Sequence, residues 1–332
     1  MIQSEHRVTS LFGELRGGSR RALARCLSLI ESTASDDRLK AYELLALCGP
    51  LSGASRRIGL TGAPGVGKST LVEALGLGML EHGRRVAVLA VDPSSKRTGG
   101  SILGDKVRMP QLSLADRAYV RPSPSKLALG GATITTRDAI IVCEAAGYDT
   151  ILVETVGVGQ SETEVADMVD LFLLLLLPTA GDEVQGIKRG IMEVAHALVI
   201  TKSDIDHQAS SRAEAMFTST LRMMTPPNED WIPPVMSMSS EDGNGIVELI
   251  RLCDSFFRAE RKQTIQTVRG QQRSTWFTSA LQYELGQIFE RDRGYSTLIE
   301  VMRAQVLSGT VPPSVALHRL FSTLSIAISE RM

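Results

Sequence analysis

The chain has 332 residues, enough for one α/β domain of about 200 residues with helical additions. Its formal net charge of -1 and its aromatic content of 5% give no electrostatic or stacking reason to expect nucleic acid or an anionic membrane surface as a partner. Residues 1–16 lack the apolar segment of a secretory signal, and the longest apolar run, residues 171–177, is far shorter than the roughly 20 residues of a bilayer span, so we expect a cytoplasmic protein.

The N-terminal part of the sequence, residues 8–48, has a helical pattern. Apolar side chains recur at helical spacing from residue 21 to residue 30 and predict one helix. A second helix is expected to begin near Ser35, because two aspartates would then lie in its first turn, where carboxylates favour the helix dipole. The dipeptide Gly49-Pro50 is expected to end it.

The cysteines are widely separated along the chain. They form no CxxC pair and no Cys/His ligand spacing, so we interpret them as buried structural thiols in a reducing cytoplasm. They are Cys26, Cys48, Cys143 and Cys253.

From residue 57 to about residue 250, short apolar runs alternate with helical segments. Continuous apolar runs are typical of strands that are buried on both faces of a parallel sheet. Helical stretches separate most of them, so the pattern predicts repeated βαβ units and a doubly wound, mainly parallel α/β domain. The expected strands are residues 58–61, 86–91, 118–121, 150–154, 171–177, 197–201 and 234–237.

After residue 256 the strand pattern stops. Residues 258–290 and 296–331 predict amphipathic helices with breaks near Gly294, Gly309 and the Pro312-Pro313 pair. Their apolar stripe, which includes Trp276, could pack on the sheet domain or against a second subunit.

Residues 62–70 carry the most informative motif, GAPGVGKST, which fits G-x-x-x-x-G-K-[ST]. It follows an apolar strand and opens a helix, so its backbone N–H groups can form a concave anion site at a helix N-terminus. In this P-loop, Lys68 would reach the β and γ phosphates and Ser69 would ligate Mg²⁺. The alternative is a glycine-rich turn that binds nothing. The expected phosphate-binding residues are Gly62, Ala63, Pro64, Gly65, Val66, Gly67, Lys68, Ser69 and Thr70.

A second motif indicates which base is bound. Residues 201–204, TKSD, end an apolar strand and match the N-K-x-D motif of GTPases, with Thr201 in place of Asn. The Asp204 carboxylate would accept hydrogen bonds from the guanine N1–H and amino group, whereas adenine lacks this donor pair. Lys202 belongs to the same motif. Ser239 and Ser240 follow another apolar strand, where GTPases place a small-residue loop against the base.

Carboxylates at the ends of other strands are candidate Mg²⁺ ligands. Asp92 and Glu154 each follow or end an expected strand, and Asp105 could join them from an intervening loop. Glu154 and Gly157 resemble a second switch motif, but the next residue, Val158, cannot orient the attacking water as a glutamine does. We therefore expect slow hydrolysis by the isolated chain, with Glu154 at the catalytic site and a completing group supplied by another loop or a partner.

Long strings of the sequence resemble the MeaB/ArgK group of P-loop GTPases, which also includes the human methylmalonic aciduria type A protein. They include the P-loop, VDPSS at residues 91–95, TGGSILGDK at 98–106, RPSPS at 121–125, VETVGVGQSE at 153–162 and GIKRGIM at 186–192. The resemblance continues to Gln271, Gln272 and Trp276, and so covers nearly the whole chain.

The resemblance implies a GTP- and GDP-binding chaperone. Such a protein gates adenosylcobalamin delivery to an adenosylcobalamin-dependent acyl-CoA mutase, and protects or reactivates that enzyme. The partner would carry the cobalamin, because this chain lacks the Asp-x-His-x-x-Gly motif. The resemblance also implies contact with the adenosyltransferase, a homodimer, and Mg²⁺ surrounded by Asp92, Asp105 and Glu154. Lys188, in a third switch at residues 181–189, would move in to aid hydrolysis once the mutase docks.

The expected domains are an N-terminal helical extension (residues 1–55), a P-loop GTPase domain (56–255) and a C-terminal helical dimerisation region (256–332). The sequence departs from the family at two places. Lys126-Leu127-Ala128 replaces the usual switch-loop sequence, and this change bears on which mutase is the client. Thr201 replaces Asn. The alternatives are a P-loop ATPase or kinase-type enzyme, or a nickel metallochaperone GTPase. Ala63 and Pro64 disfavour the ATPase, since that class has a second lysine early in the loop, and the scattered histidines disfavour the nickel metallochaperone.

Overall fold

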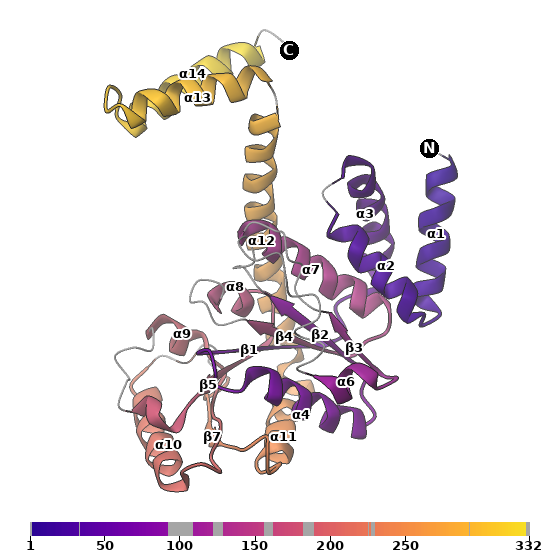
Figure 1. Cartoon of the computed structure of the whole chain (residues 1–332), viewed down its shortest axis with the longest axis vertical. Coiled ribbons are helices and arrows are strands. Elements are labelled where there is room, and N and C mark those ends of the chain that lie inside the picture. Colours follow the sequence, from indigo (N-terminus) through magenta and orange to yellow (C-terminus); the bar gives the residue numbers. More distant parts are fainter. Residues whose placement is uncertain are drawn as a thin grey trace. The chain divides into compact units, whose positions relative to one another are not determined.

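A computed structural model describes residues 2–32, 34–91, 109–121, 129–155, 162–181, 189–224, 226, 230–291 and 293–329. The chain forms two compact units, Met1–Gln272 and Arg273–Met332. The first unit contains a sheet with helices on both faces (Figure 1).

The sheet of the first unit has seven strands in the order β3-β2-β4-β1-β5-β6-β7, and its neighbouring strands pair in parallel. Every expected strand is present, so the predicted doubly wound α/β fold is confirmed. β1 lies in the middle of the sheet, where Ile58 is paired with Leu152 of β4 and Leu171 of β5. The strands are β1 (Arg56–Gly62), β2 (Val86–Val91), β3 (Ala118–Arg121), β4 (Thr150–Thr155), β5 (Leu171–Leu176), β6 (Ala197–Ile200) and β7 (Val235–Ser237).

The helices of the first unit cover both faces of the sheet. Alternate residues of one strand enter different cores: Val86 and Val88 of β2 pack with one cluster, and Ala87 and Leu89 pack with the other. On one face lie α4 (Lys68–Glu81), α6 (Pro110–Leu114) and α11 (Ile246–Phe256). The other core includes residues of α1 (Ile2–Arg16), α2 (Arg20–Ile30), α3 (Ser35–Cys48), α7 (Leu129–Ala145), α8 (Glu162–Ala166), α9 (Arg189–Val194) and α10 (His207–Leu221).

The N-terminal helices begin and end close to the expected residues. The Ser19 hydroxyl accepts a hydrogen bond from the Ala22 amide at 3.2 Å and so caps α2. As predicted, α3 begins at Ser35 and ends at Cys48. Gly49, however, keeps a right-handed φ of -50° and begins the 3₁₀ turn η1 (Gly49–Leu51), so it ends the helix without the left-handed conformation common for glycine.

The C-terminal helices are also present. The first begins later than the expected residue 258, because Arg258 is extended and the 3₁₀ turn η3 (Ala259–Arg261) comes before the long helix. The second begins at Arg293, earlier than the expected residue 296. Gly309 has a φ of +71° between the last two helices, where the sequence predicted a break. The helices are α12 (Lys262–Arg291), α13 (Arg293–Leu307) and α14 (Pro313–Ser329). Among the described helices, none has both the length and the apolar character that crossing a membrane requires.

The four cysteines are free and buried, as predicted. Burial is the main cause that raises the pKa of Cys26 to about 12 and that of Cys48 to about 11. These thiols therefore stay protonated and act as apolar core groups.

A buried charge cluster joins the first turns of α12 to the amino ends of β1 and β5. The Arg269 guanidinium donates to both carboxylate oxygens of Asp170, at 2.7 and 2.6 Å, and to the Ser55 carbonyl oxygen at 2.5 Å. The side chains of Arg269 and Asp170 are only 3% and 1% exposed. Beside them, Arg57 forms a two-bond pair with Glu144 at 3.0 and 3.1 Å. The Arg269–Asp170 pair therefore anchors the first turns of α12 to the sheet, and the Arg57–Glu144 pair joins β1 to α7.

Candidate nucleotide-binding site

The P-loop runs from the end of β1 to the start of α4, as the sequence predicted. Gly67 precedes α4 with a φ of +95°, a left-handed conformation that side chains disfavour. Gly62 has no room for a side chain, because a Cβ atom there would lie 2.5 Å from the Leu175 carbonyl oxygen. The glycines of the motif are thus required by the local backbone. Ala63, Pro64 and Gly65 are exposed at the tip of the loop.

Lys68 points back into this loop. Its ammonium group donates to the carbonyl oxygens of Gly62 at 2.8 Å and Ala63 at 3.0 Å, and the residue is only 7% exposed. A buried cation beside backbone N–H groups at a helix start is an environment that attracts phosphate oxygens. The loop therefore holds its positive group where anions would bind.

Ser69 and Glu154 meet at the next position along α4. The Ser69 hydroxyl donates to Glu154 Oε1 at 2.8 Å, and Glu154 is only 7% exposed. The contact follows from the sheet, since Leu60 of β1 is paired with Glu154 of β4. One hydroxyl and one carboxylate side by side are oxygen donors of the kind that Mg²⁺ prefers, so these residues fit the expected ion.

Several expected site residues lie outside the described part of the chain. They are Asp92, Asp105, Gly157, Val158 and Lys188. Of the four expected Mg²⁺ ligands, the structure therefore describes Ser69 and Glu154, which are in contact.

Thr201 fixes the base-recognition loop to the P-loop. Its hydroxyl donates to the Val66 carbonyl oxygen at 2.6 Å and also lies 3.2 Å from the Leu176 carbonyl oxygen. The residue is 3% exposed. The sequence singled Thr201 out only as a departure from Asn, and its role as a tether was missed. A buried hydroxyl-bearing residue at the end of an apolar strand was the available signal, because such a group needs a hydrogen-bond partner.

Lys202 follows in a left-handed conformation, with a φ of 57°. A lysine pays a conformational cost for this backbone geometry, which surrounding contacts must hold in place. Its side chain runs toward the P-loop, since a Cβ atom placed on Gly67 would lie 4.0 Å from Lys202 Cε. The aliphatic part of Lys202 thus borders the phosphate loop.

Asp204 faces the loop after β7. Hydrogen bonding from the Ser239 side chain is the main cause that lowers the pKa of Asp204, so the carboxylate is ionised at neutral pH. Within the described residues, its Oδ1 atom is shielded from solvent and has no hydrogen-bond partner. An acceptor that is shielded from water and receives no hydrogen bond is unfavourable, so a ligand N–H group that donates to it would stabilise the site.

The two base loops are bonded to each other. The Ser203 amide donates across to the Met238 carbonyl oxygen at 3.1 Å. Within the loop after β7, Ser239 Oγ accepts from the Asp242 amide at 3.2 Å. Ser240 is the next residue in this partly buried turn. The structure therefore brings Asp204, Ser239 and Ser240 together at the carboxyl edge of the sheet.

A strand–loop–helix phosphate motif at the central strand of a parallel sheet, with an acidic loop two strands away, defines a P-loop nucleotide-binding protein. A sequence model of the family "Methylmalonyl Co-A mutase-associated GTPase MeaB" matches residues 23–292. The chain belongs to this family.

Individual relatives agree with the family match. The chain is 43% identical over 313 residues to the GTPase ArgK of Escherichia coli, which covers 92% of this chain and 93% of that protein. It is also 43% identical over 321 residues to the mitochondrial methylmalonic aciduria type A homolog of Mus musculus, covering 93% of this chain and 77% of that protein. Among solved structures, a crystal structure described as LAO/AO transport system kinase is 34% identical, with a TM-score of 0.76, and covers 96% of this chain and 97% of that one.

These findings decide between the alternatives that the sequence left open. The chain is a GTPase and binds guanine nucleotides, in agreement with the prediction from the P-loop and the TKSD motif. The resemblance to the MeaB/ArgK group is likewise confirmed.

Proposed function

We propose that the chain uses GTP binding and hydrolysis to gate adenosylcobalamin delivery to an adenosylcobalamin-dependent acyl-CoA mutase, and that it protects or reactivates this enzyme. The observation that carries the proposal is the match of residues 23–292 to a family named for its association with methylmalonyl-CoA mutase. That enzyme is accordingly the first candidate client. The adenosyltransferase is proposed as a further partner, because adenosylcobalamin must reach the complex of this chain and the mutase from the enzyme that makes that cofactor.

In this proposal the described residues divide the work of binding GTP. Asp204 selects guanine, because its shielded Oδ1 lacks a donor that the guanine edge supplies. Lys68 exchanges its two carbonyl contacts for the β and γ phosphates. Ser69 and Glu154 hold Mg²⁺, with Asp92 and Asp105 as further proposed ligands. When bound, Mg²⁺ would neutralise charge on the phosphate oxygens.

Hydrolysis is proposed to need a group that the resting site lacks. Val158 occupies the position of the water-orienting glutamine, so basal turnover is expected to stay below about 1 s⁻¹, the lower end for complete phosphoryl-transfer sites. Lys188 is the proposed completing group. Once the docked mutase brings it in, its charge would stabilise the transition state as an arginine finger does.

A homodimer through the C-terminal helices is also proposed. On α12, the apolar side chains of Phe277, Leu281 and Leu285 recur every four residues and are 69%, 47% and 45% exposed. Leu317 and Phe321 of α14 are 54% and 55% exposed. Apolar side chains that recur on one helix face support a protein–protein contact. Sedimentation velocity of the whole chain tests this proposal: Phe277→Glu with Leu281→Glu should yield a monomer if the dimer forms there.

The function is tested by cofactor loading of apo-methylmalonyl-CoA mutase. Transfer of adenosylcobalamin from the adenosyltransferase is followed by absorbance in the presence of this chain with GTP, with a non-hydrolysable GTP analogue, or with GDP. Gating requires that the nucleotide state change the rate or extent of loading, and that Lys68→Ala remove this dependence. Identical loading in all nucleotide states would contradict the proposal.

A single-turnover GTPase assay with and without the mutase tests the role of Lys188. Lys188→Ala should keep GDP affinity and basal hydrolysis, yet lose most of the stimulation that the mutase confers. If this variant is stimulated as strongly as the parent chain, the completing group comes from elsewhere.

A further inference from the structure

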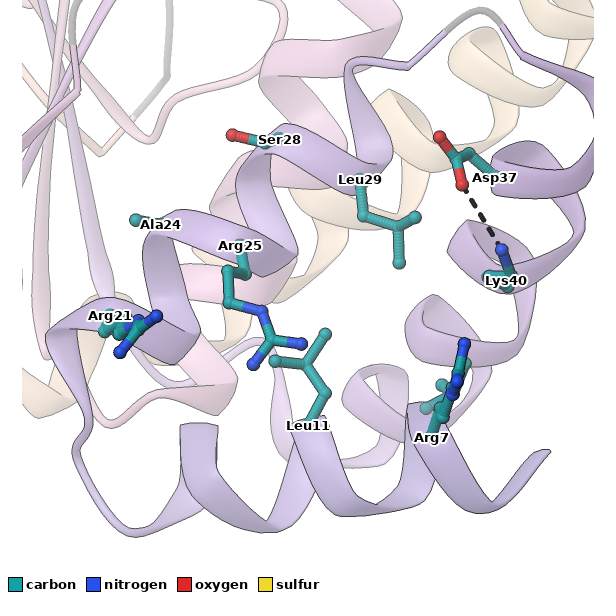
Figure 2. Close-up of a pocket in the computed structure, with 10 residues that line it drawn as sticks. Arg7, Leu11, Arg21, Ala24, Arg25, Ser28, Leu29, Asp37 and Lys40 are labelled. Carbon is teal, nitrogen blue, oxygen red and sulfur yellow. Dashed lines mark hydrogen bonds and ion pairs between the residues drawn. The ribbon is translucent and has the colours of Figure 1, made fainter. Parts of the chain in front are cut away.

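A cavity of about 500 Å³ lies among α1, α2 and α3, and none of its lining residues belongs to the nucleotide site (Figure 2). We call it the N-terminal cavity. Its volume falls within the roughly 300–1,000 Å³ typical of small-molecule sites. The family match begins at residue 23, so the α1 wall of the cavity lies outside the segment that identifies the family.

The floor of the N-terminal cavity is apolar. Val8 and Leu11 of α1 are 3% and 7% exposed, and Leu29 of α2 faces them. In Figure 2 the side chains of Leu11 and Leu29 point into the space between the helices. An apolar arm bound here would lose contact with water, which is favourable in proportion to the area buried.

The rim of the cavity is basic, and its cations come from all three helices. They are Arg7 of α1, Arg21 and Arg25 of α2, and Lys40 of α3. Arg21 and Arg25 are four residues apart and so lie on the same face of α2. A chain whose net charge is -1 thus gathers four cations around one apolar hollow.

The single acidic residue of the lining does not neutralise this rim. Asp37 accepts from the Ser32 hydroxyl at 2.8 Å and pairs with Lys40 at 3.4 Å. The contact of Arg25 with Glu14 is long, 3.9 Å, and both side chains are at least half exposed, so it contributes little. Arg7 and Arg21 form no ion pair with the residues that the structure describes. At least two arginines therefore remain available to an anion.

We propose that the N-terminal cavity binds an amphipathic organic anion. A carboxylate or phosphate head would lie among Arg7, Arg21 and Arg25, since guanidinium groups bind both heads through paired hydrogen bonds. The apolar arm would cover Leu11 and Leu29. The apolar floor disfavours a bare inorganic anion, and the basic rim disfavours a neutral lipid.

The proposal is tested by calorimetric titration of the whole chain with four probes below their micelle concentrations. Octanoate and octyl phosphate carry both parts of the ligand, inorganic phosphate carries the head alone, and octyl glucoside carries the arm alone. Each amphipathic anion should bind at least about tenfold more tightly than either partial probe. The preferred head identifies the source of the ligand, carboxylate or phosphate.

Variants locate the binding. Arg21→Glu and Arg25→Glu should each weaken binding of the preferred anion at least about tenfold, and Ala24→Trp should block the cavity without changing its charge. Arg212→Glu on the exposed face of α10 is the matched control and should change nothing. Unchanged GDP affinity checks that each variant is folded.

Three results would overturn the proposal. The first is that octyl glucoside binds as tightly as the amphipathic anions. The second is that the cavity variants bind the preferred anion as tightly as the parent chain does. The third is that neither octanoate nor octyl phosphate binds at about 1 mM. If an acidic amphipathic peptide binds there instead while the organic anions do not, the cavity is a docking site for a protein.

Discussion

The ion pair between Arg269 and Asp170 allows a direct test of how α12 is held to the sheet. Replacing Arg269 with methionine keeps an unbranched side chain but leaves the Asp170 carboxylate, 1% exposed, without its cation. The Ser55 carbonyl oxygen loses its donor as well. Removing one partner of a buried pair costs about 3–5 kcal/mol, because the remaining charge is uncompensated. The Arg57 amide still donates to Asp170 at 2.9 Å, so the lower half of that range is expected.

Urea unfolding followed by circular dichroism measures this loss. Arg269→Met should lower the free energy of unfolding by about 3–4 kcal/mol. Adding Asp170→Asn to the same chain removes the stranded charge but keeps an oxygen for the Arg57 amide, so the double variant should recover at least about 1 kcal/mol. The matched control is Arg251→Met, whose exposed pair with Glu248 spans 3.8 Å and should change stability by less than about 0.5 kcal/mol.

The reasoning would be refuted if Arg269→Met cost less than about 1 kcal/mol, the scale of an ordinary surface change. It would also be refuted if the double variant were less stable than Arg269→Met alone, since the penalty would then not come from an unpaired carboxylate. The nucleotide site lies at the opposite, carboxyl ends of the strands, so GDP affinity of the folded variant should not change.

Three further predictions concern single side chains. In competitive binding, the parent chain should prefer GDP over ADP at least about 100-fold, or roughly 3 kcal/mol, and equal affinity for the two would refute this. Asp204→Asn should shift the preference from GDP toward xanthosine diphosphate. Thr201→Val keeps the side-chain shape but removes the donor to Val66, so GDP affinity should fall about fivefold to thirtyfold, or about 1–2 kcal/mol. Burial, and to a lesser extent the charge of Arg261, lowers the pKa of His196 from 6.5 to about 4. The unfolded chain therefore binds this proton more tightly than the folded chain. Folding stability is lost as pH falls from 6.5 to 4, by at most about 1.4 kcal/mol per pH unit. His196→Asn should remove that part of the slope in urea unfolding at several pH values, while His82→Asn, an exposed control, should leave it.

The fold could be predicted from the sequence because its signals are local. Each expected strand is a short apolar run, and the run at Leu171–Leu176 is buried at every position. The P-loop could be predicted for the same reason. Its glycines are required by positive φ angles within the loop and by the close approach of one neighbouring strand. Helix ends were less accurate: the pattern near residue 258 did not reveal that Arg258 is extended and that a 3₁₀ turn precedes α12.

Contacts between distant segments could not be predicted in the same way. Arg269 and Asp170 are 99 residues apart, and nothing in either local pattern pairs them. The N-terminal cavity also depends on how three helices pack, although the basic residues of α2 were visible in the sequence. Periodicity tells which face of a helix is buried, but it does not identify the partner of a polar group on that face.

The Thr201 contact shows why the phosphate and base motifs should be treated as one unit. Its amide and hydroxyl both approach the Leu176 carbonyl oxygen at the end of β5, at 2.9 and 3.2 Å, while the hydroxyl donates to Val66 inside the P-loop. Three residues later, Asp204 presents its shielded acceptor. A change in the position of the base loop must therefore move, or break, a buried hydrogen bond to the phosphate loop. Because an unpaired buried carbonyl is costly, the two loops are held in one relative position, and the Thr201 hydroxyl maintains the coupling even though it is shorter than the asparagine of related GTPases.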